Sequence, residues 1–334
     1  MQLKKITFMF RKFLRDLNGN KHLKINQENT TPLLSGYYFK FEENLSRLNR
    51  LIHSFDEKGV PINTSYIDVE KRQLHYYPIT IGQYGLAVFH SWLSTRQEVK
   101  KQLFLNIADW FQTHAVTDND LGTYWLTEVP KPEFQVFKPW KSAFAQSRGI
   151  SILLRAWQIT GEEKYLATAS KALIPFTKDI SEGGVAVDRN IQETFYEEYV
   201  AARPTRVLDG HGFSLFGLYD FVRATGDGRL TEYNRLALRL FNEGVEGLIR
   251  QLPSFDMGFW LRFNRCEVPG YPKDDPCTIS YLRLVLLQIE VLYRITKREE
   301  LLEYRKKFEK YDALFPILKM YRFKFRALKK LNRL

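Results

Sequence analysis

Cysteine is scarce in this chain of 334 residues. Its two cysteines, Cys266 and Cys277, lie eleven positions apart and no second pair accompanies them. This arrangement matches neither a zinc-binding spacing nor a disulfide framework, and it is typical of a reducing compartment. The histidines are scattered without metal-ligand spacing, so we predict no metal and no other cofactor.

Long apolar runs are also lacking. Neither end has the uninterrupted hydrophobic stretch of a signal peptide or of a membrane-spanning helix. The glycines of Gly210-His211-Gly212 form a segment that is too short for a nucleotide-binding loop and follows no predicted strand. Hydrophobic residues make up 44% of the chain and charged residues 26%, as in ordinary globular proteins. We therefore predict a cytoplasmic globular protein.

Acidic residues are missing from the two ends of the sequence, apart from Asp16. The net charge is +12, and residues 1–24 contribute +6 while residues 316–334 contribute +7. The rest of the chain is thus nearly neutral, which argues against a broad nucleic-acid-binding face. Aromatic and leucine side chains alternate with the basic residues at both ends. This pattern predicts attachment to the inner face of a membrane or to membrane-bound glycan-assembly proteins, and a tail folded back onto the body is the alternative.

Threonine marks an internal repeat. Thr95, Thr160, Thr225 and Thr296 are separated by 65, 65 and 71 residues, and each lies between two segments with apolar residues at helical spacing. We expect each threonine to cap the start of the second segment. The first segments span residues 82–94, 144–159, 212–224 and 278–295, and the second segments span 97–113, 163–176, 229–248 and 299–313.

A helical hairpin repeated in this way predicts stacked units. We predict an all-α fold in which about four hairpins close into an (α/α) barrel or toroid, with a small N-terminal extension; an open superhelix is the alternative. The predicted parts are a basic amphipathic segment over 1–36, the barrel over 37–313 and a basic amphipathic tail over 314–334.

The links between hairpins are long, running over 115–140, 178–210 and 250–277. Loops of this length are usually functional, and in a ring they would emerge at one end. They are rich in carboxylates, arginines and aromatic rings, which suit proton transfer, carboxylate binding and sugar stacking. The densest cluster is Phe195-Tyr196-Glu197-Glu198-Tyr199. We therefore predict a site for an acidic sugar at this end.

Several segments resemble the C-terminal domain of the heparan/heparosan D-glucuronyl C5-epimerase family. In chain order they span residues 77–86, 142–146, 195–199, 207–210 and 214–220. The resemblance implies an (α/α) barrel, and a compact, bacterial-type member without the β-rich module of animal relatives. It also implies that the enzyme inverts C5 of uronic acid residues in a heparosan-like polysaccharide by removing and returning a proton.

Of the tyrosines associated with this chemistry, the resemblance carries one over, to Tyr199, with Glu198 beside it. The other two positions fall near Trp260 and Pro276, which cannot exchange a proton. We predict Tyr199 and Glu198 as proton carriers and Arg262 as the cation that neutralises the substrate carboxylate. The predicted substrate-binding residues are aromatic or charged side chains of the same segments: Tyr84, Trp140, Tyr196, Arg206, Asp209, Trp260 and Tyr271.

Two other functions fit the same residues. A uronate lyase would remove the C5 proton and expel the C4 substituent, which needs no acid on the opposite face. A homologue without catalysis would bind glycan or act as a scaffold in polysaccharide assembly. The two missing tyrosines keep both alternatives open.

Overall fold

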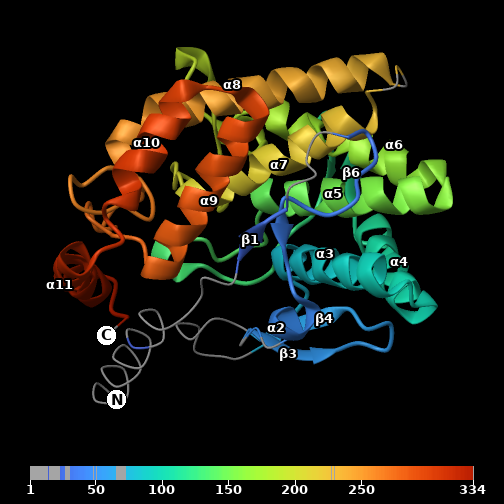
Figure 1. The fold of residues 1–334 in the computed structure, drawn as a ribbon, viewed down its shortest axis with the longest axis horizontal. Coiled ribbons are helices and arrows are strands. Elements are labelled where there is room, and N and C mark those ends of the chain that lie inside the picture. Colours follow the sequence, from blue (N-terminus) through green and yellow to red (C-terminus); the bar gives the residue numbers. More distant parts are fainter. Residues whose placement is uncertain are drawn as a thin grey trace.

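A computed structural model describes residues 14, 23–26, 31–47, 49, 51–64, 73–226, 228 and 230–333. Most of the predicted N-terminal segment over 1–36 lies outside these residues. Helices dominate what is described (Figure 1). They are α2 (Glu43–Arg47), α3 (Pro78–Thr95), α4 (Glu98–Thr113), α5 (Ala143–Thr160), α6 (Glu163–Lys171), α7 (Leu208–Ala224), α8 (Thr231–Phe255), α9 (Ile279–Thr296), α10 (Glu299–Glu309) and α11 (Leu314–Lys330).

The predicted hairpins are confirmed. Each of the pairs α3–α4, α5–α6, α7–α8 and α9–α10 packs together, and the first helices contact one another in the series α3, α5, α7 and α9. Figure 1 shows this series through the middle of the molecule, with α4, α6, α8 and α10 outside it. The mostly helical fold is thus confirmed, and closure of the series into a ring stays a prediction.

The threonines act differently from the prediction. Thr95, Thr160 and Thr296 are the last residues of their first helices, and Thr225 follows α7 directly. Each hydroxyl donates to the carbonyl four residues earlier at 2.8 Å. The second helices begin after Gln97, Glu162, Leu230 and Arg298 instead. Each hydroxyl thus adds a second hydrogen bond to a carbonyl of the last turn, and the repeat marks where the first helices end.

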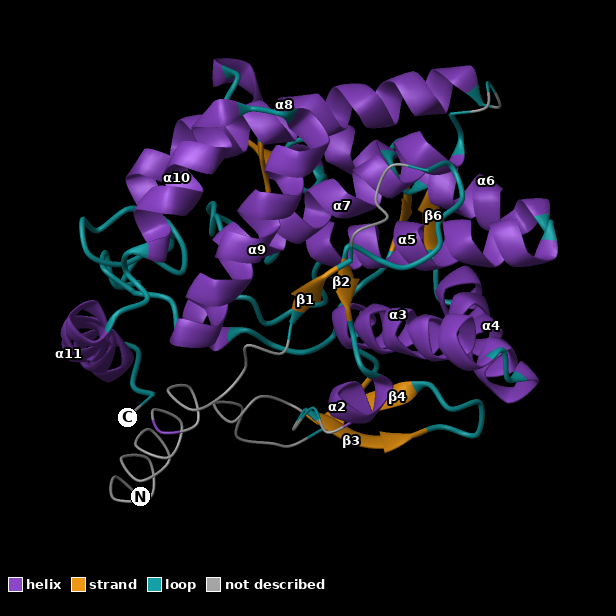
Figure 2. Ribbon diagram, in the orientation of Figure 1, coloured by secondary structure: helices purple, strands orange, loops and turns teal. Residues whose placement is uncertain are grey.

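Short strands modify the all-α prediction (Figure 2). Each pairing is antiparallel: β1 with β2, β3 with β4, β4 with β5, β6 with β7, and β8 with β9. The strands are β1 (Lys24–Ile25), β2 (Phe39–Lys40), β3 (Ile52–Phe55), β4 (Pro61–Thr64), β5 (Leu74–His75), β6 (Val116–Asp118), β7 (Gly122–Tyr124), β8 (Ala186–Val187) and β9 (Phe195–Tyr196). Four short 3-10 turns complete the loops: η1 (Pro132–Phe134), η2 (Ile174–Thr177), η3 (Ile180–Glu182) and η4 (Arg189–Ile191).

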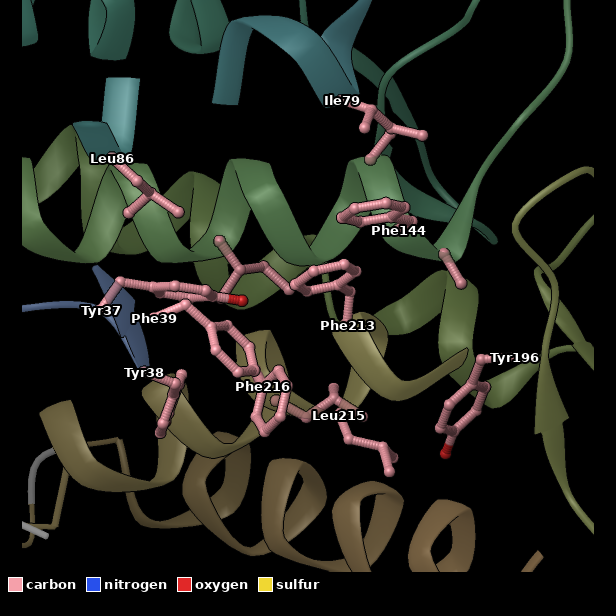
Figure 3. Packing of buried hydrophobic residues seen from close by; sticks show 14 of the residues in the cluster. Tyr37, Tyr38, Phe39, Ile79, Leu86, Phe144, Tyr196, Phe213, Leu215 and Phe216 are labelled. Atoms are coloured by element: carbon pink, nitrogen blue, oxygen red, sulfur yellow. The ribbon is translucent and has the colours of Figure 1, made fainter. Parts of the chain in front are cut away.

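The core contains aromatic side chains that precede the first hairpin. Tyr37, Tyr38 and Phe39 are fully buried, and Tyr38 stacks on Phe216 of α7 with ring centroids 4.7 Å apart. Figure 3 shows these rings between α5 and α7. Burying so much aromatic surface makes this segment part of the helical body.

Candidate functional site

The three long loops meet, as predicted, through aromatic stacking. Phe134 of the first loop stacks on Tyr199 of the second at 4.9 Å and on Tyr271 of the third at 5.4 Å. Trp140 contacts Tyr199 at 5.1 Å. The pairs Lys131–Val136 and Thr127–Trp140 form antiparallel bridges, so the first loop folds into a hairpin over Tyr199. Residues far apart in the sequence therefore share one end of the helical body.

An open cleft of about 500 Å³ lies beside this stack. Trp140 lines the cleft and also contacts Tyr199, so it separates the two. Tyr124 and Phe137 add aromatic surface, and Lys138 and Lys141 add positive charge. Aromatic rings with nearby cations are chemically suited to an acidic sugar.

Glu198 and Asp209 form a buried carboxyl pair behind Tyr199. Glu198 packs against the first turn of α7, where a Cβ on Gly210 would lie 2.5 Å from its Oε2 atom. Only glycine therefore allows this approach. Burial raises the pKa of Glu198 to about 7, against the opposing effects of a hydrogen bond from Tyr199 and the charge of Lys131. Burial and then the charge of Glu198 hold the pKa of Asp209 well above its ordinary value.

Such a pair resists full ionisation. Two carboxylates in one buried place resist a second negative charge, so one proton is shared between them over a wide pH range. Lys131 supplies the nearby cation. Its Nζ lies 4.6 Å from the centre of the Tyr199 ring and 3.8 Å from a carboxylate oxygen of Glu133.

The sequence analysis did not predict a role for Lys131, because it considered the carboxylates, arginines and aromatic rings of the loops. The feature that could have indicated Lys131 is its position between Pro130 and Pro132, since each proline restricts the neighbouring backbone. It also missed Phe134, which joins the three loops.

Glu197, the neighbour of Glu198, instead stabilises the second loop. Its carboxylate accepts hydrogen bonds from the hydroxyl and backbone N–H of Thr205 and from the backbone N–H of Arg206. Burial raises the pKa of Glu197 to about 7, and these hydrogen bonds oppose the rise. Arg206 has a positive φ of 41°, and this carboxylate helps to hold it there.

Two more predicted binding residues, Tyr196 and Arg206, are buried and have structural partners. The hydroxyl of Tyr196 donates to the carbonyl of Leu240 in α8 at 2.7 Å (Figure 3). Arg206 forms a two-point ion pair with Asp188 at 2.7 and 2.9 Å and a further pair with Glu267 at 2.6 Å. Both side chains tie the second loop to neighbouring segments.

Arg262, Trp260 and Tyr271 all belong to the third loop. Arg262 pairs with Asp274 at 2.8 Å and donates to the carbonyls of Ser254 and Asp256. Trp260 is fully buried and donates to the carbonyl of Cys277. The loop's polar groups are therefore engaged mainly with one another.

Tyr271 is the member of the third loop that reaches the stack. Its hydroxyl donates to Asp275 at 2.8 Å. Burial and the charge of Asp275 raise its pKa. Phe134 stacks on both Tyr271 and Tyr199, so the two phenols belong to one aromatic stack.

Two other residues considered from the sequence lie in the packed interior. Tyr84 is buried in α3 and contacts Phe55 at 5.2 Å. His211 accepts from the backbone N–H of Tyr196 and bonds to the carbonyl of Gly244, so it is a neutral histidine that donates through Nε2. Burial lowers its pKa to about 4.

The described residues contain few other reactive side chains. Both cysteines are free thiols, and burial raises the pKa of each, that of Cys266 to about 12. In the described part of the chain, no group of three or more His, Cys, Asp or Glu side chains could hold a metal ion. Among the same residues, no helix is both long and apolar enough to cross a bilayer.

Comparison with known proteins agrees with the resemblance seen in the sequence. Residues 122–310, which include the loops of the site and helices α5 to α10, match the model of the D-glucuronyl C5-epimerase C-terminus. A D-glucuronyl C5-epimerase of Caenorhabditis elegans is 33% identical over 189 residues, covering 54% of this chain and 30% of the worm protein. An uncharacterized protein of Methanocaldococcus jannaschii is 29% identical over 186 residues, covering 55% of this chain and 56% of the archaeal protein. The chain thus covers less than two thirds of either relative, and it belongs to the family defined by the D-glucuronyl C5-epimerase C-terminus.

Proposed function

We propose that the protein is a uronate C5-epimerase that acts on an acidic polysaccharide, bound where the long loops meet. The observation that carries the proposal is that Tyr199 contacts Trp140 and hydrogen-bonds Glu198, whose charge raises the pKa of Asp209. A sugar stacked near Trp140 would have a proton-exchanging group within reach. The (α/α) barrel expected for the family would bring the loops to one end.

The C5 proton of a uronic acid is next to a carboxylate, so its removal builds negative charge there. In the proposed reaction Tyr199 removes the C5 proton from one face of the sugar ring and passes a proton to Glu198, and a water molecule returns a proton to the opposite face, which inverts C5. Lys131 lies against the Tyr199 ring, and we assign it the neutralisation of the growing charge. Arg262, our sequence-based candidate for that task, would hold the third loop through Asp274.

Substrate access would require the hairpin over Tyr199 to move. Tyr199 and Glu198 are each only 7% exposed, and Phe134 covers the phenol. Besides the Phe134 stack, an exposed hydrogen bond from Gln135 to the carbonyl of Pro269 joins this hairpin to the third loop at 3.0 Å. An exposed hydrogen bond is a weak restraint, and we propose that the hairpin opens for a polymer.

Hydrogen exchange at C5 tests the proposal directly. The protein is incubated with heparosan in deuterated water, and the polymer is analysed by NMR for deuterium at C5 and for iduronate. We expect exchange with the unaltered protein and its loss with Tyr199→Phe. Tyr165→Phe is the control, because that hydroxyl binds Asp109 at a distant helix contact.

The same incubation separates the alternatives. A product absorbing in the near ultraviolet would identify a lyase, which removes the same proton but expels the C4 substituent. Binding of the polymer without exchange or cleavage would identify a glycan-binding homologue. Either result, or exchange that persists in Tyr199→Phe, would refute the proposed epimerase mechanism.

A further inference from the structure

Helix α11 lies at one edge of the molecule, beyond the third loop (Figure 1). One face of the helix is fixed to the body. Ile317, Met320 and Ala327 are buried, and Lys324 pairs with Asp275 at 2.6 Å. Because these contacts hold α11 along its length, the direction of its opposite face is also fixed.

The opposite face is both apolar and exposed. Leu314, Phe315, Leu318 and Phe325 are 66%, 84%, 54% and 49% exposed. At 100° per residue, all four side chains fall within about 100° of the helix circumference. Two exposed phenylalanines on one stripe of a surface helix are unusual unless something covers them.

Positive charge surrounds this apolar stripe. Lys319, Arg322, Arg326 and Lys329 are exposed on the same half of the helix. The sequence contains no acidic residue after Asp312. The face therefore carries both apolar side chains and positive charges, and both would contact the same flat surface.

We propose that this face of α11 docks on the surface of an anionic lipid bilayer. Lysines and arginines would contact the headgroups while the phenylalanines and leucines enter the boundary with the acyl chains. The four exposed apolar side chains favour a bilayer over an acidic polysaccharide, since a polyanion alone would not cover them. This inference does not depend on the proposed reaction.

Docking would also position the candidate site. Asp275, the partner of Lys324, accepts the hydroxyl of Tyr271, and Lys330 donates to the carbonyl of Tyr271. The face of α11 that binds the body is thus joined to the loop that contributes to the aromatic stack. The site would lie near the bilayer and act on chains held there, and this one step rests on the proposed function.

Vesicle sedimentation tests the docking. The full chain is mixed with vesicles of phosphatidylcholine and phosphatidylglycerol in a two-to-one ratio, and with vesicles of phosphatidylcholine alone. We expect sedimentation with the anionic vesicles only, weakened by salt. The double variant Phe315→Ser and Phe325→Ser should bind the anionic vesicles at least about tenfold more weakly, a loss of about 1.4 kcal/mol.

A matched double variant controls for the loss of exposed apolar surface. Val99→Ser and Ile191→Ser change side chains that are 69% and 62% exposed on other elements, and should leave vesicle binding unchanged. In a second measurement, Phe315→Trp should be quenched by brominated lipid and Val99→Trp should not. Thermal unfolding of each variant verifies that the fold is intact.

The proposal would be overturned if the unaltered protein did not sediment with anionic vesicles. It would also be overturned if the Phe315→Ser and Phe325→Ser double variant sedimented as well as the unaltered protein. A third contrary result is binding to heparosan that depends on Phe315 and Phe325 while vesicles do not bind. These results concern lipid and leave the C5 reaction untouched. Conversely, vesicle binding without C5 exchange would refute the proposed function and leave the docking surface in place.

Discussion

Two of the buried clusters of charged side chains in the described part of this protein differ in how their charges are balanced. In the body, Arg155 pairs with Asp220 at 2.7 Å with both side chains fully buried. Beside it Arg148 is also fully buried, and its guanidinium lies within 5.4 Å of the centres of four aromatic rings. At the meeting point of the loops, Glu198 and Asp209 crowd two acids together instead.

The difference separates a structural cluster from a reactive one. Arginine stays protonated at any accessible pH, so rings and a carboxylate can hold it permanently. Because burial raises the pKa of Glu198 to about 7, the charge of this pair can change during a reaction near neutral pH. Burial alone therefore does not identify the site, whereas burial of like charges beside a cleft is informative.

The largest effect on stability is expected in the structural cluster. Asp220→Ala would leave Arg155 and Arg223 without their carboxylate and should lower the free energy of unfolding by about 3–5 kcal/mol. Urea denaturation measures the loss. If the variant does not fold, the double variant Arg155→Met and Asp220→Leu should recover much of the yield, because it removes both charges. A loss below about 1 kcal/mol would contradict the assigned role.

Substitution in the Glu198–Asp209 pair should instead lower the activity. Glu198→Gln keeps the shape of the side chain but cannot exchange the proton, so C5 exchange should fall at least about a hundredfold. Its urea midpoint should stay within experimental error of, or rise above, that of the unaltered protein. Glu182→Gln in η3 is the control, because Glu182 caps an exposed turn. Full exchange activity in Glu198→Gln would remove this residue from the mechanism.

The two candidate cations can be ranked by a direct comparison. Lys131→Met should lower kcat/KM for C5 exchange by about ten- to a hundredfold, because charge neutralisation next to Tyr199 is lost. Arg262→Met should lower thermal stability more than activity, since it breaks contacts with Asp274 and two carbonyls. The reverse ranking would restore Arg262 as the residue that neutralises the substrate.

The smallest expected effect is in the pH dependence of stability. Because the folded pKa of Glu198 is raised from 4.5 to about 7, its favourable contribution is complete below pH 4.5 and is lost as the pH rises through 7. Asp209→Asn removes the neighbouring acid and should make the protein more stable at pH 8 by about 1–3 kcal/mol. Urea unfolding at pH 5 and pH 8 measures the change. Equal stabilisation at both pH values would contradict the charge coupling.

Much of the candidate site was accessible from the sequence, but its internal roles were not. The segment 195–199 lies where the loops meet, and Tyr199 of this segment contacts Trp140 of the first loop. Adjacent residues in an extended segment point to opposite sides. For this reason Glu197 holds the turn at Thr205 while Glu198 faces Asp209, and composition could not distinguish them.

The sequence by itself determined the helical hairpins, the long links between them, the family and the basic amphipathic character of residues 314–334. These features depend on local periodicity and on motifs that are contiguous in the chain. Only the tertiary structure decided that Lys131 lies against Tyr199, that Arg206 and Arg262 are held by carboxylates, and which face of α11 is exposed. Such relations join residues from separate loops, and only the packing of the whole chain brings them within reach of each other.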